Sequence, residues 1–166
     1  FLEMNTRLQV EHPVTELVTG VDLVREMVRI AAGEPLSIPA DGIAPRGHAI
    51  EARIYAEDPA KNFLPSPGEI TAMTEPAGPH IRIDAGAAPG SKVTVYYDPL
   101  IAKLIVWGDD RPAALATMRD ALAHYEIDGV KTNLPLLRRL FADADVQAGR
   151  ISTRFVDERL AAIMSV

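Results

Sequence analysis

The chain has 166 residues, of which 48% are hydrophobic and 24% charged, so it contains enough apolar material for one ordinary core. Its net charge of −6 and the absence of a Lys/Arg cluster argue against nucleic acid as a partner. No apolar run is long enough to predict a membrane-spanning helix. The sequence has no Cys, which excludes disulfides, thiolate catalysis and cysteine-ligated zinc and suits a reducing compartment.

Alternating residues open the chain. Even positions from Leu2 to Val10 are apolar except for Thr6, and this alternation predicts an extended strand with one buried face. The other face carries five polar residues, which we call the polar row: Glu3, Asn5, Arg7, Gln9 and Glu11. An ordinary half-exposed strand is the simpler interpretation. However, carboxylate, amide and guanidinium groups without Lys or Ser are atypical of a solvated face and favour a functional site.

Each group of the polar row suits work on a phosphorylated anion. Glu3 and Asn5 offer hard oxygen ligands to Mg²⁺, which shares its other positions with phosphate and water. Arg7 offers a planar fork of donors for a carbonate, phosphate or enolate oxygen, and Glu11 is a candidate base. A straight strand, rising ~3.3 Å per residue, would hold Glu3 and Glu11 about 26 Å apart. If both act in one site, we expect the backbone to leave strand geometry between Arg7 and Glu11.

The next segment predicts two helices. Pro13 suits the first turn of a short helix over 13–19. Residues 21–32 show an amphipathic pattern that predicts a helix, which Gly33 ends. The apolar stripe that we expect this helix to bury consists of Val24, Met27, Val28 and Ala31.

A Pro- and Gly-rich segment, 34–46, has no periodicity and is the best candidate for a boundary between two domains, 1–46 and 47–166. Residues 47–57 then predict a strand whose inward residues are Ile50, Ala52, Ile54 and Ala56. The opposite face of this strand carries Glu51, Arg53 and Tyr55. From the pattern alone, a charged pair on such a face is more often a surface ion pair of little energetic worth.

Short strands separated by Gly/Pro turns follow a loop over 58–68. We expect these strands over 69–74, 80–84, 92–97 and 101–107. Regularly spaced short strands favour an antiparallel sheet, so the chain as a whole is predicted to be of the α+β class. Asp98 ends one strand at a turn, where it is expected to cap backbone amides.

Helical signals return at the end of the chain. Asp110 and Pro112 open a helix with one apolar face, formed by Leu115, Met118, Leu122 and Tyr125. Asn133 is predicted to cap a helix over 134–142. Thr153 is predicted to cap a last helix, whose inward residues are Val156, Leu160 and Ile163.

Several strings resemble a known family. Glu-x-Asn-x-Arg resembles the metal-binding end of ATP-grasp ligases, and the longer string from Glu3 to Glu16 resembles biotin carboxylase. The resemblance extends over nearly the whole chain, through Arg46 to Ile54, Phe63 to Gly68, Tyr96 to Asp98 and Asp128 to Asn133. It implies that 1–46 end an ATP-grasp domain and that 47–166 form a biotin carboxylase C-terminal domain, a mainly antiparallel sheet with flanking helices. At Met4, Thr6 and Pro13 the chain resembles acyl-CoA carboxylases more than pyruvate carboxylases.

The resemblance implies ATP- and bicarbonate-dependent carboxylation of biotin N1 on a carrier protein. Glu3 and Asn5 match residues that hold Mg²⁺ (or Mn²⁺) against the phosphates of ATP, and Glu3 also contacts the nucleotide. Glu11 matches the base that deprotonates bicarbonate. The implied catalytic residues are Arg7, Glu11 and Arg53.

Binding and assembly are implied in the same way. The residues that match a bicarbonate and biotin site are Arg7, Gln9, the main chain at Val10, and Arg53, with Arg7 facing the biotin enolate. Arg82 matches a dimer-contact position, which implies a homodimer. Further implied partners are the biotin carboxyl carrier protein or domain and the carboxyltransferase subunit, with no nucleic acid and no membrane. The implied location is the cytoplasm in a bacterium or the mitochondrial matrix in a eukaryote.

Two other functions remain open. The family's glycine-rich lid, ATP-gripping lysines and second metal-binding glutamate precede the first residue here, so we expect a C-terminal fragment that is inactive alone. Such a piece could instead be a non-catalytic module for dimerisation or partner binding. A different ATP-grasp ligase, such as carbamoyl-phosphate synthetase, shares Glu-x-Asn-x-Arg, but the continuation from Gln9 to Pro13 and Arg53 speak against it.

Overall fold

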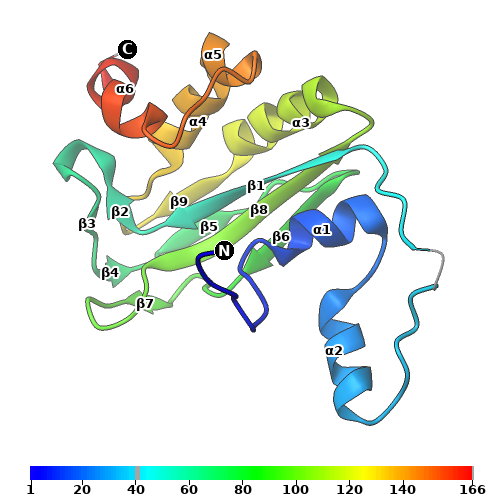
Figure 1. Ribbon diagram of the computed structural model, residues 1–166. Coiled ribbons are helices and arrows are strands. Elements are labelled where there is room, and N and C mark those ends of the chain that lie inside the picture. Colours follow the sequence, from blue (N-terminus) through cyan, green and yellow to red (C-terminus); the bar gives the residue numbers. More distant parts are fainter. Residues whose placement is uncertain (40–41, 166) are drawn as a thin grey trace.

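A three-stranded antiparallel sheet forms the centre of the computed structural model, which describes residues 1–39 and 42–165 (Figure 1). The order of its strands is β1 (His48–Tyr55), β8 (Leu100–Gly108) and β6 (Ile81–Ala85). Both pairs are antiparallel. The expected α+β fold with an antiparallel sheet is therefore confirmed.

The central strand β8 is buried because its two faces are both covered. Ala102, Leu104 and Val106 belong to the main hydrophobic core. Ile105, which points to the opposite side of the pleat, is also fully buried. Residues that read as a nearly continuous apolar run thus form a strand between two layers of helix.

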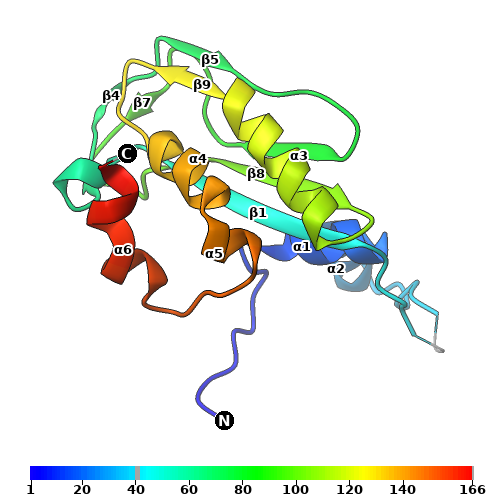
Figure 2. The same ribbon diagram turned by 90° about the horizontal axis from the view of Figure 1, so that it is seen from above.

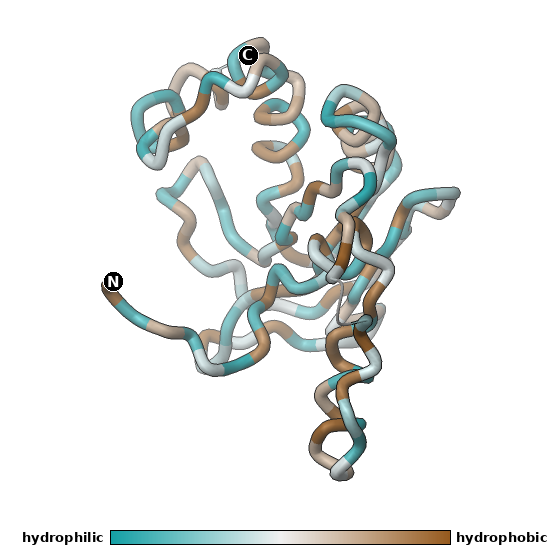
Figure 3. Tube along the Cα trace, turned by 45° about the vertical axis from the view of Figure 1, so that its right-hand side comes forward, coloured by the Kyte–Doolittle hydropathy of each residue, from teal (hydrophilic) through white to brown (hydrophobic). Residues whose placement is uncertain are grey.

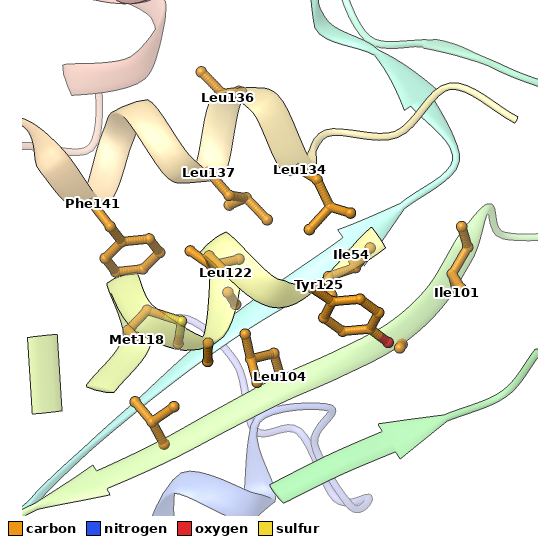
Figure 4. Close-up of a cluster of buried hydrophobic side chains, with 14 of the residues drawn as sticks. Ile54, Ile101, Leu104, Met118, Leu122, Tyr125, Leu134, Leu136, Leu137 and Phe141 are labelled. Carbon is orange, nitrogen blue, oxygen red and sulfur yellow. The ribbon is translucent and has the colours of Figure 1, made fainter. Parts of the chain in front are cut away.

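Helices α3 (Arg111–His124) and α4 (Leu134–Ala142) cover one face of the sheet (Figure 2). Asp110 accepts a hydrogen bond of 2.8 Å from the amide of Ala113, so the predicted start of α3 is confirmed. The core between the helices and the sheet includes fully buried large side chains from each layer (Figure 4), among them Ile54, Leu104, Met118, Leu122 and Tyr125. Burial of one such side chain stabilises the fold by about 1.5–3 kcal/mol.

The opposite face of the sheet is covered by α1 (His12–Thr19), and α2 (Leu23–Ala31) projects beyond the sheet (Figure 1). Both helices lie where the sequence predicts them. The expectation that α2 buries its apolar stripe is wrong. Val24, Met27, Val28 and Ala31 are exposed, because no described element packs against that side of the helix. Hydrophobic residues recur along this projecting segment (Figure 3). Asp22 caps α2 through a 2.8 Å bond from the amide of Arg25.

The remaining strands are short and form three separate pairs. These pairs are β2 (Glu57–Asp58) with β3 (Leu64–Pro65), β4 (Gly68–Glu69) with β7 (Lys92–Val93), and β5 (Ala72–Thr74) with β9 (Glu126–Asp128). A 3₁₀ turn, η1 (Pro59–Lys61), joins β2 to β3, so the expected loop over 58–68 is partly ordered. The expected strand over 69–74 is divided in two, and the strand expected over 92–97 ends at Val93.

Two close approaches of the chain lie beside these short strands. Asp98 accepts a 2.8 Å bond from the amide of Leu100, as predicted, and so ends the segment before β8. Gly129 has a φ of +96°, and a side chain there would place its Cβ 2.0 Å from the carbonyl oxygen of Glu69. Only glycine therefore allows this close approach of the chain after β9 to the chain after β4.

The C-terminal helices are α5 (Ala144–Gln147) and α6 (Phe155–Met164), of which only α6 was predicted. Ile163 is buried and Val156 and Leu160 pack against the core, as expected. Thr153 is not the cap. Instead, the Ser152 side chain accepts from Arg154 N at 3.3 Å and the Ser152 carbonyl accepts from Phe155 N at 3.1 Å, which satisfies the first amides.

The first ten residues do not form a strand. A strand requires a partner strand for its backbone groups, and no described strand pairs with this segment. Leu2 and Met4 are therefore exposed, and the chain extends away from the sheet (Figure 2). The chain bends at Arg7 and turns at Val10 and Glu11 before α1. The predicted departure from extended geometry is thus confirmed. Within the described residues, no helix has both the length and the apolar character needed to cross a membrane.

Candidate active site

The polar row lines one side of an open groove of about 710 Å³. The turn before α1 brings both ends of the polar row to the same groove. The other wall of this groove is formed by α2 and the segment after it. The residues of the row that line the groove are Glu3, Asn5, Arg7, Gln9 and Glu11. Arg7 donates to the carbonyl of its neighbour Leu8 at 3.2 Å. Its guanidinium is otherwise directed at no described acceptor within hydrogen-bond distance.

Glu11 meets Arg53 at the edge of this groove. Arg53 Nη2 donates to Glu11 Oε2 at 2.9 Å, which joins the N-terminal turn to strand β1. The side chains of Arg53 and Glu11 are 38% and 53% exposed. An ion pair that is exposed to this extent contributes little to stability, about 0–1 kcal/mol. The structure thus brings together two predicted site residues in a contact that an incoming anion can replace.

A second carboxylate lies on the other edge of the Arg53 guanidinium. Glu51 Oε1 is 3.5 Å from Arg53 Nε, and the Glu51 side chain is only 6% exposed. Burial raises the pKa of Glu51, although Lys103 and Arg53 partly oppose this effect. The nearby Tyr55 phenol and these two carboxylates raise the pKa of Arg53. A permanently charged guanidinium therefore lies between one exposed and one buried carboxylate.

The main chain of the turn is held by the central strand. Lys103 Nζ donates to the carbonyl of Val10 at 3.1 Å and lies 3.1 Å from Asp84 Oδ2. The Lys103 side chain is 12% exposed. Strand register explains this arrangement, because Lys103 pairs with Arg53 on one side and with Asp84 on the other. The carbonyl of Val10 is therefore fixed relative to the sheet.

Arg82 belongs to a network inside the chain. It makes two bonds to Asp84, of 2.8 and 3.1 Å, and donates to Glu16 Oε2 at 2.6 Å. Burial raises the pKa of Asp84, but hydrogen bonds from Arg82 and Lys103 outweigh burial and hold it below its usual range. Glu16 Oε1 accepts from the amide of Leu23 at 2.7 Å. The predicted dimer-contact residue therefore connects the sheet to α1 and to the start of α2.

Asn133 occupies the N-cap position of α4, as predicted, but its side chain makes no capping hydrogen bond. Its side chain is buried and bonds to strand β1 on both sides of Ile54, directly after the candidate site residue Arg53. Nδ2 donates to the carbonyl of Arg53 at 3.0 Å, and Oδ1 accepts from the amide of Tyr55 at 3.0 Å. The amide is thus used to position the strand, and its oxygen is bonded to the Tyr55 amide of β1 and to no amide of the helix end.

Sequence reasoning did not identify three of these residues as parts of the site, namely Glu51, Asp84 and Lys103. One signal for Lys103 was available, because it is the single charged residue within the apolar strand from Leu100 to Trp107. Glu51 and Asp84 lie in ordinary alternating strands and give no comparable signal. No group of three or more His, Asp or Glu suited to a metal ion occurs in 1–39 or 42–165. Glu3 and Asn5 could thus supply at most part of a metal's coordination.

Comparisons with known proteins show which family the chain resembles. Residues 51–158 match the biotin carboxylase C-terminal domain, and residues 1–39 match the ATP-binding domain of the carbamoyl-phosphate synthase L chain. The chain is 52% identical over 160 residues to the mitochondrial propionyl-CoA carboxylase alpha chain of Homo sapiens, covering 95% of this chain and 22% of that protein. It is 49% identical over 160 residues to the biotin carboxylase of Haemophilus influenzae, covering 96% and 36% of the two chains.

A solved structure is similar over almost the whole chain. It is the biotin carboxylase domain dimer of the Hydrogenobacter thermophilus 2-oxoglutarate carboxylase, in complex with MgADP, ADP and bicarbonate. The TM-score is 0.95 at 49% identity, and the match covers 98% of this chain and 36% of that one. This chain therefore spans between about a fifth and just over a third of the proteins that it matches. The chain belongs to the biotin carboxylase family, and it contains that family's C-terminal domain.

Proposed function

We propose that the chain is the C-terminal part of a biotin carboxylase, which uses ATP and bicarbonate to carboxylate N1 of biotin on a carrier protein. The observation that carries this proposal is the ion pair of 2.9 Å between Glu11 and Arg53. It brings the candidate base and a candidate anion-binding residue to the same edge of the groove, from segments 42 residues apart in the chain.

Bicarbonate is proposed to bind between the turn and strand β1. It would take the place of the Glu11 carboxylate on the Arg53 guanidinium, whose planar donors suit a carbonate oxygen pair. Glu11 would then accept the bicarbonate proton, and the oxyanion could attack the terminal phosphate of ATP. Gln9 and the main chain at Val10 are proposed to hold bicarbonate from the turn side.

Arg7 is proposed to act on biotin. It lines the groove and its guanidinium has room for an anion, which suits stabilisation of the enolate that biotin forms as N1 becomes a nucleophile. A well-placed donor of this kind typically lowers the barrier by about 3–4 kcal/mol. Arg53 is proposed to contact both bicarbonate and biotin from the second domain.

Glu3 and Asn5 fit a role in holding Mg²⁺, or Mn²⁺, together with ATP. Both line the groove and are exposed, and together they offer carboxylate and amide oxygens, the hard ligands that these ions prefer. The related Hydrogenobacter thermophilus structure contains MgADP and bicarbonate, which supports the proposal. When bound, the metal would neutralise charge on the phosphates. Two ligands are too few for a complete site, so substrate phosphates and water are expected to supply the rest.

The domain division and assembly are also proposals. We infer that residues 1–46 end the ATP-grasp domain and that residues 47–166 form the C-terminal domain. The family matches over 1–39 and 51–158 support this division.

A homodimer with Arg82 at the contact is supported by the dimeric relative. The proposed partners are the biotin carboxyl carrier and the carboxyltransferase, and the proposed location is the bacterial cytoplasm or the mitochondrial matrix. The chain is 52% identical to a propionyl-CoA carboxylase and 49% identical to a 2-oxoglutarate carboxylase. Because these values are so similar, membership of the acyl-CoA carboxylases is a proposal that rests on Met4, Thr6 and Pro13.

Neither alternative explains the site as well. A purely dimer-forming or partner-binding module has no need of carboxylate, amide and guanidinium groups gathered around one groove. A carbamoyl-phosphate synthetase shares the family match over residues 1–39, but the relatives that match 95% or more of the chain are carboxylases.

A chimera provides the test. In the Haemophilus influenzae biotin carboxylase, this chain would replace the matching segment, which is 36% of that enzyme. Biotin carboxylation by the chimera is expected, and Arg53→Ala should lower it strongly. Arg119→Ala removes an exposed arginine of α3 and serves as the control, with no change expected. Equal activity of the two variants would contradict the proposed function.

A further inference from the structure

The two carboxylates that share Arg53 differ in their surroundings. Glu11 lies on the turn and is 53% exposed, whereas Glu51 lies on β1 and is 6% exposed. Arg53 reaches them through different atoms, Nη2 at 2.9 Å and Nε at 3.5 Å. An anion that enters the groove can therefore replace Glu11 without disturbing the contact with Glu51.

Stability alone does not explain a carboxylate at position 51. Its Oε2 atom is buried and has no hydrogen-bond partner among the described residues. A buried polar atom without a partner costs free energy, and burial of the charge adds to that cost. An apolar residue opposite the buried Ile105 in the strand register would avoid both penalties. Such a local violation of the burial rules is typical of a functional position.

The geometry points to different roles for the two carboxylates, Glu11 as the group that bicarbonate replaces and Glu51 as the group that stays in place. We propose that Glu51 is a positioning residue, which keeps the Arg53 guanidinium directed at the position of the Glu11 carboxylate while bicarbonate displaces that carboxylate. This inference rests on the roles proposed above for Glu11 and Arg53. Without Glu51, the loss of the Glu11 contact would leave the guanidinium with no carboxylate and only the neighbouring Tyr55 phenol to hold it, just when it has to bind the substrate.

The backbone is restrained for the same purpose. Asn133 fixes the carbonyl of Arg53 and the amide of Tyr55, so β1 itself cannot shift when the ion pair with Glu11 opens. Lys103 lies beside Arg53 in the register and favours the charged form of Glu51. The Arg53 side chain is thus the one part of this arrangement left to be positioned, and Glu51 is the buried group in contact with it.

The first experiment follows Arg53 by NMR in the 166-residue chain. Hydrogen exchange at Arg53 Nε is compared in wild type, Glu51→Gln and Glu57→Gln. Glu57 is the matched control, because burial also raises its pKa but it forms no ion pair within the described residues. Loss of the ion pair at Nε is expected to speed exchange about tenfold in Glu51→Gln. Unchanged exchange would overturn the proposal.

Two further measurements support this experiment. Circular dichroism verifies that each variant is folded. Glu51→Asp keeps the charge on a shorter side chain and is expected to give an intermediate exchange rate.

The second experiment uses the chimera and separates this inference from the proposed function. Glu51→Gln is expected to raise the KM for bicarbonate about tenfold and to lower kcat much less, since Glu51 touches Arg53 but not the reacting atoms. Glu57→Gln should change neither constant. If Arg53→Ala is strongly impaired but Glu51→Gln matches Glu57→Gln, the positioning role is wrong and the proposed function stands. If Arg53→Ala itself is fully active, the proposed function fails.

Discussion

Lys103, in the middle of the central strand, donates a hydrogen bond of 3.1 Å to the carbonyl of Val10, which precedes it by 93 residues. The same ammonium group lies 3.1 Å from Asp84. One mostly buried lysine thus fixes the turn that carries Glu11 to the face of the sheet that carries Arg53. The position of Glu11 relative to Arg53 therefore depends on the sheet more than on the turn itself.

Lys103→Met tests this dependence. Methionine keeps a long apolar side chain but removes the charge and the donor, so the free energy of unfolding should fall by about 1–3 kcal/mol. Amide exchange at His12, which bonds to the Gln9 carbonyl in the same turn, should become faster. Lys92→Met on the exposed strand β7 is the control and should stay within about 0.5 kcal/mol of wild type. Urea unfolding and exchange mass spectrometry measure both effects, and equal behaviour of the two variants would contradict the role of Lys103.

Asn133→Ala is expected to destabilise the chain. It leaves the Arg53 carbonyl and the Tyr55 amide without their side-chain partners, at a cost of about 1–3 kcal/mol. Asn5→Ala removes an exposed asparagine and should change stability by less than about 0.5 kcal/mol. Urea unfolding of the two variants gives the comparison. A cost for Asn133→Ala no larger than that for Asn5→Ala would show that the strand does not need this support.

Glu51 should make stability depend on pH in a defined direction. Burial raises its pKa in the folded chain, so the folded state binds the carboxyl proton more tightly than the unfolded state. Its contribution is therefore fully favourable below the ordinary carboxyl pKa and is lost as the pH rises through the folded pKa. Gln does not titrate, so Glu51→Gln should gain stability relative to wild type between about pH 4 and about pH 7. Unfolding free energies measured at both pH values test this, and a relative loss over that range would contradict it.

The isolated 166-residue chain should show no biotin-dependent ATP hydrolysis. It spans 36% of the Haemophilus influenzae biotin carboxylase, and its polar row offers Mg²⁺ only Glu3 and Asn5. Mg²⁺ relies on substrate phosphates for its other ligands, so its binding to the chain should be weak. Phosphate release with ATP, bicarbonate and biotin is the measurement, with the full-length relative as the positive control. Turnover by the chain alone would mean that its site is complete.

The parts of the fold that could be predicted are those fixed by local pattern. Strand β1 and helices α3, α4 and α6 lie as expected, because each has a clear apolar period and ends at a turn residue. Helix α2 was located correctly, but its apolar stripe is exposed, since a period shows that a face is apolar and does not show what covers it. The strand expected over the first ten residues failed for a related reason, because alternation cannot supply a neighbouring strand.

The site was predictable only in part. The motif indicated the polar row and Arg53, and the span argument correctly required a turn between Arg7 and Glu11. The supporting residue Lys103 becomes a neighbour of Arg53, and Asp84 a neighbour of Lys103, only through the register of β1, β8 and β6. Such pairings join residues far apart in the chain, so no local pattern in the sequence could reveal them.

The central claim is that Glu11 acts as the base for bicarbonate and that Arg7 acts on biotin. Phosphate release and carboxybiotin formation, measured side by side in the chimera, test this most directly. Glu11→Gln keeps the shape but cannot accept a proton, so both activities should fall together by ~10²–10⁴-fold. Arg7→Lys keeps the charge but loses the planar fork, so carboxylation should fall further than ATP cleavage. The opposite result, with ATP cleavage intact in Glu11→Gln and abolished in Arg7→Lys, would contradict these roles.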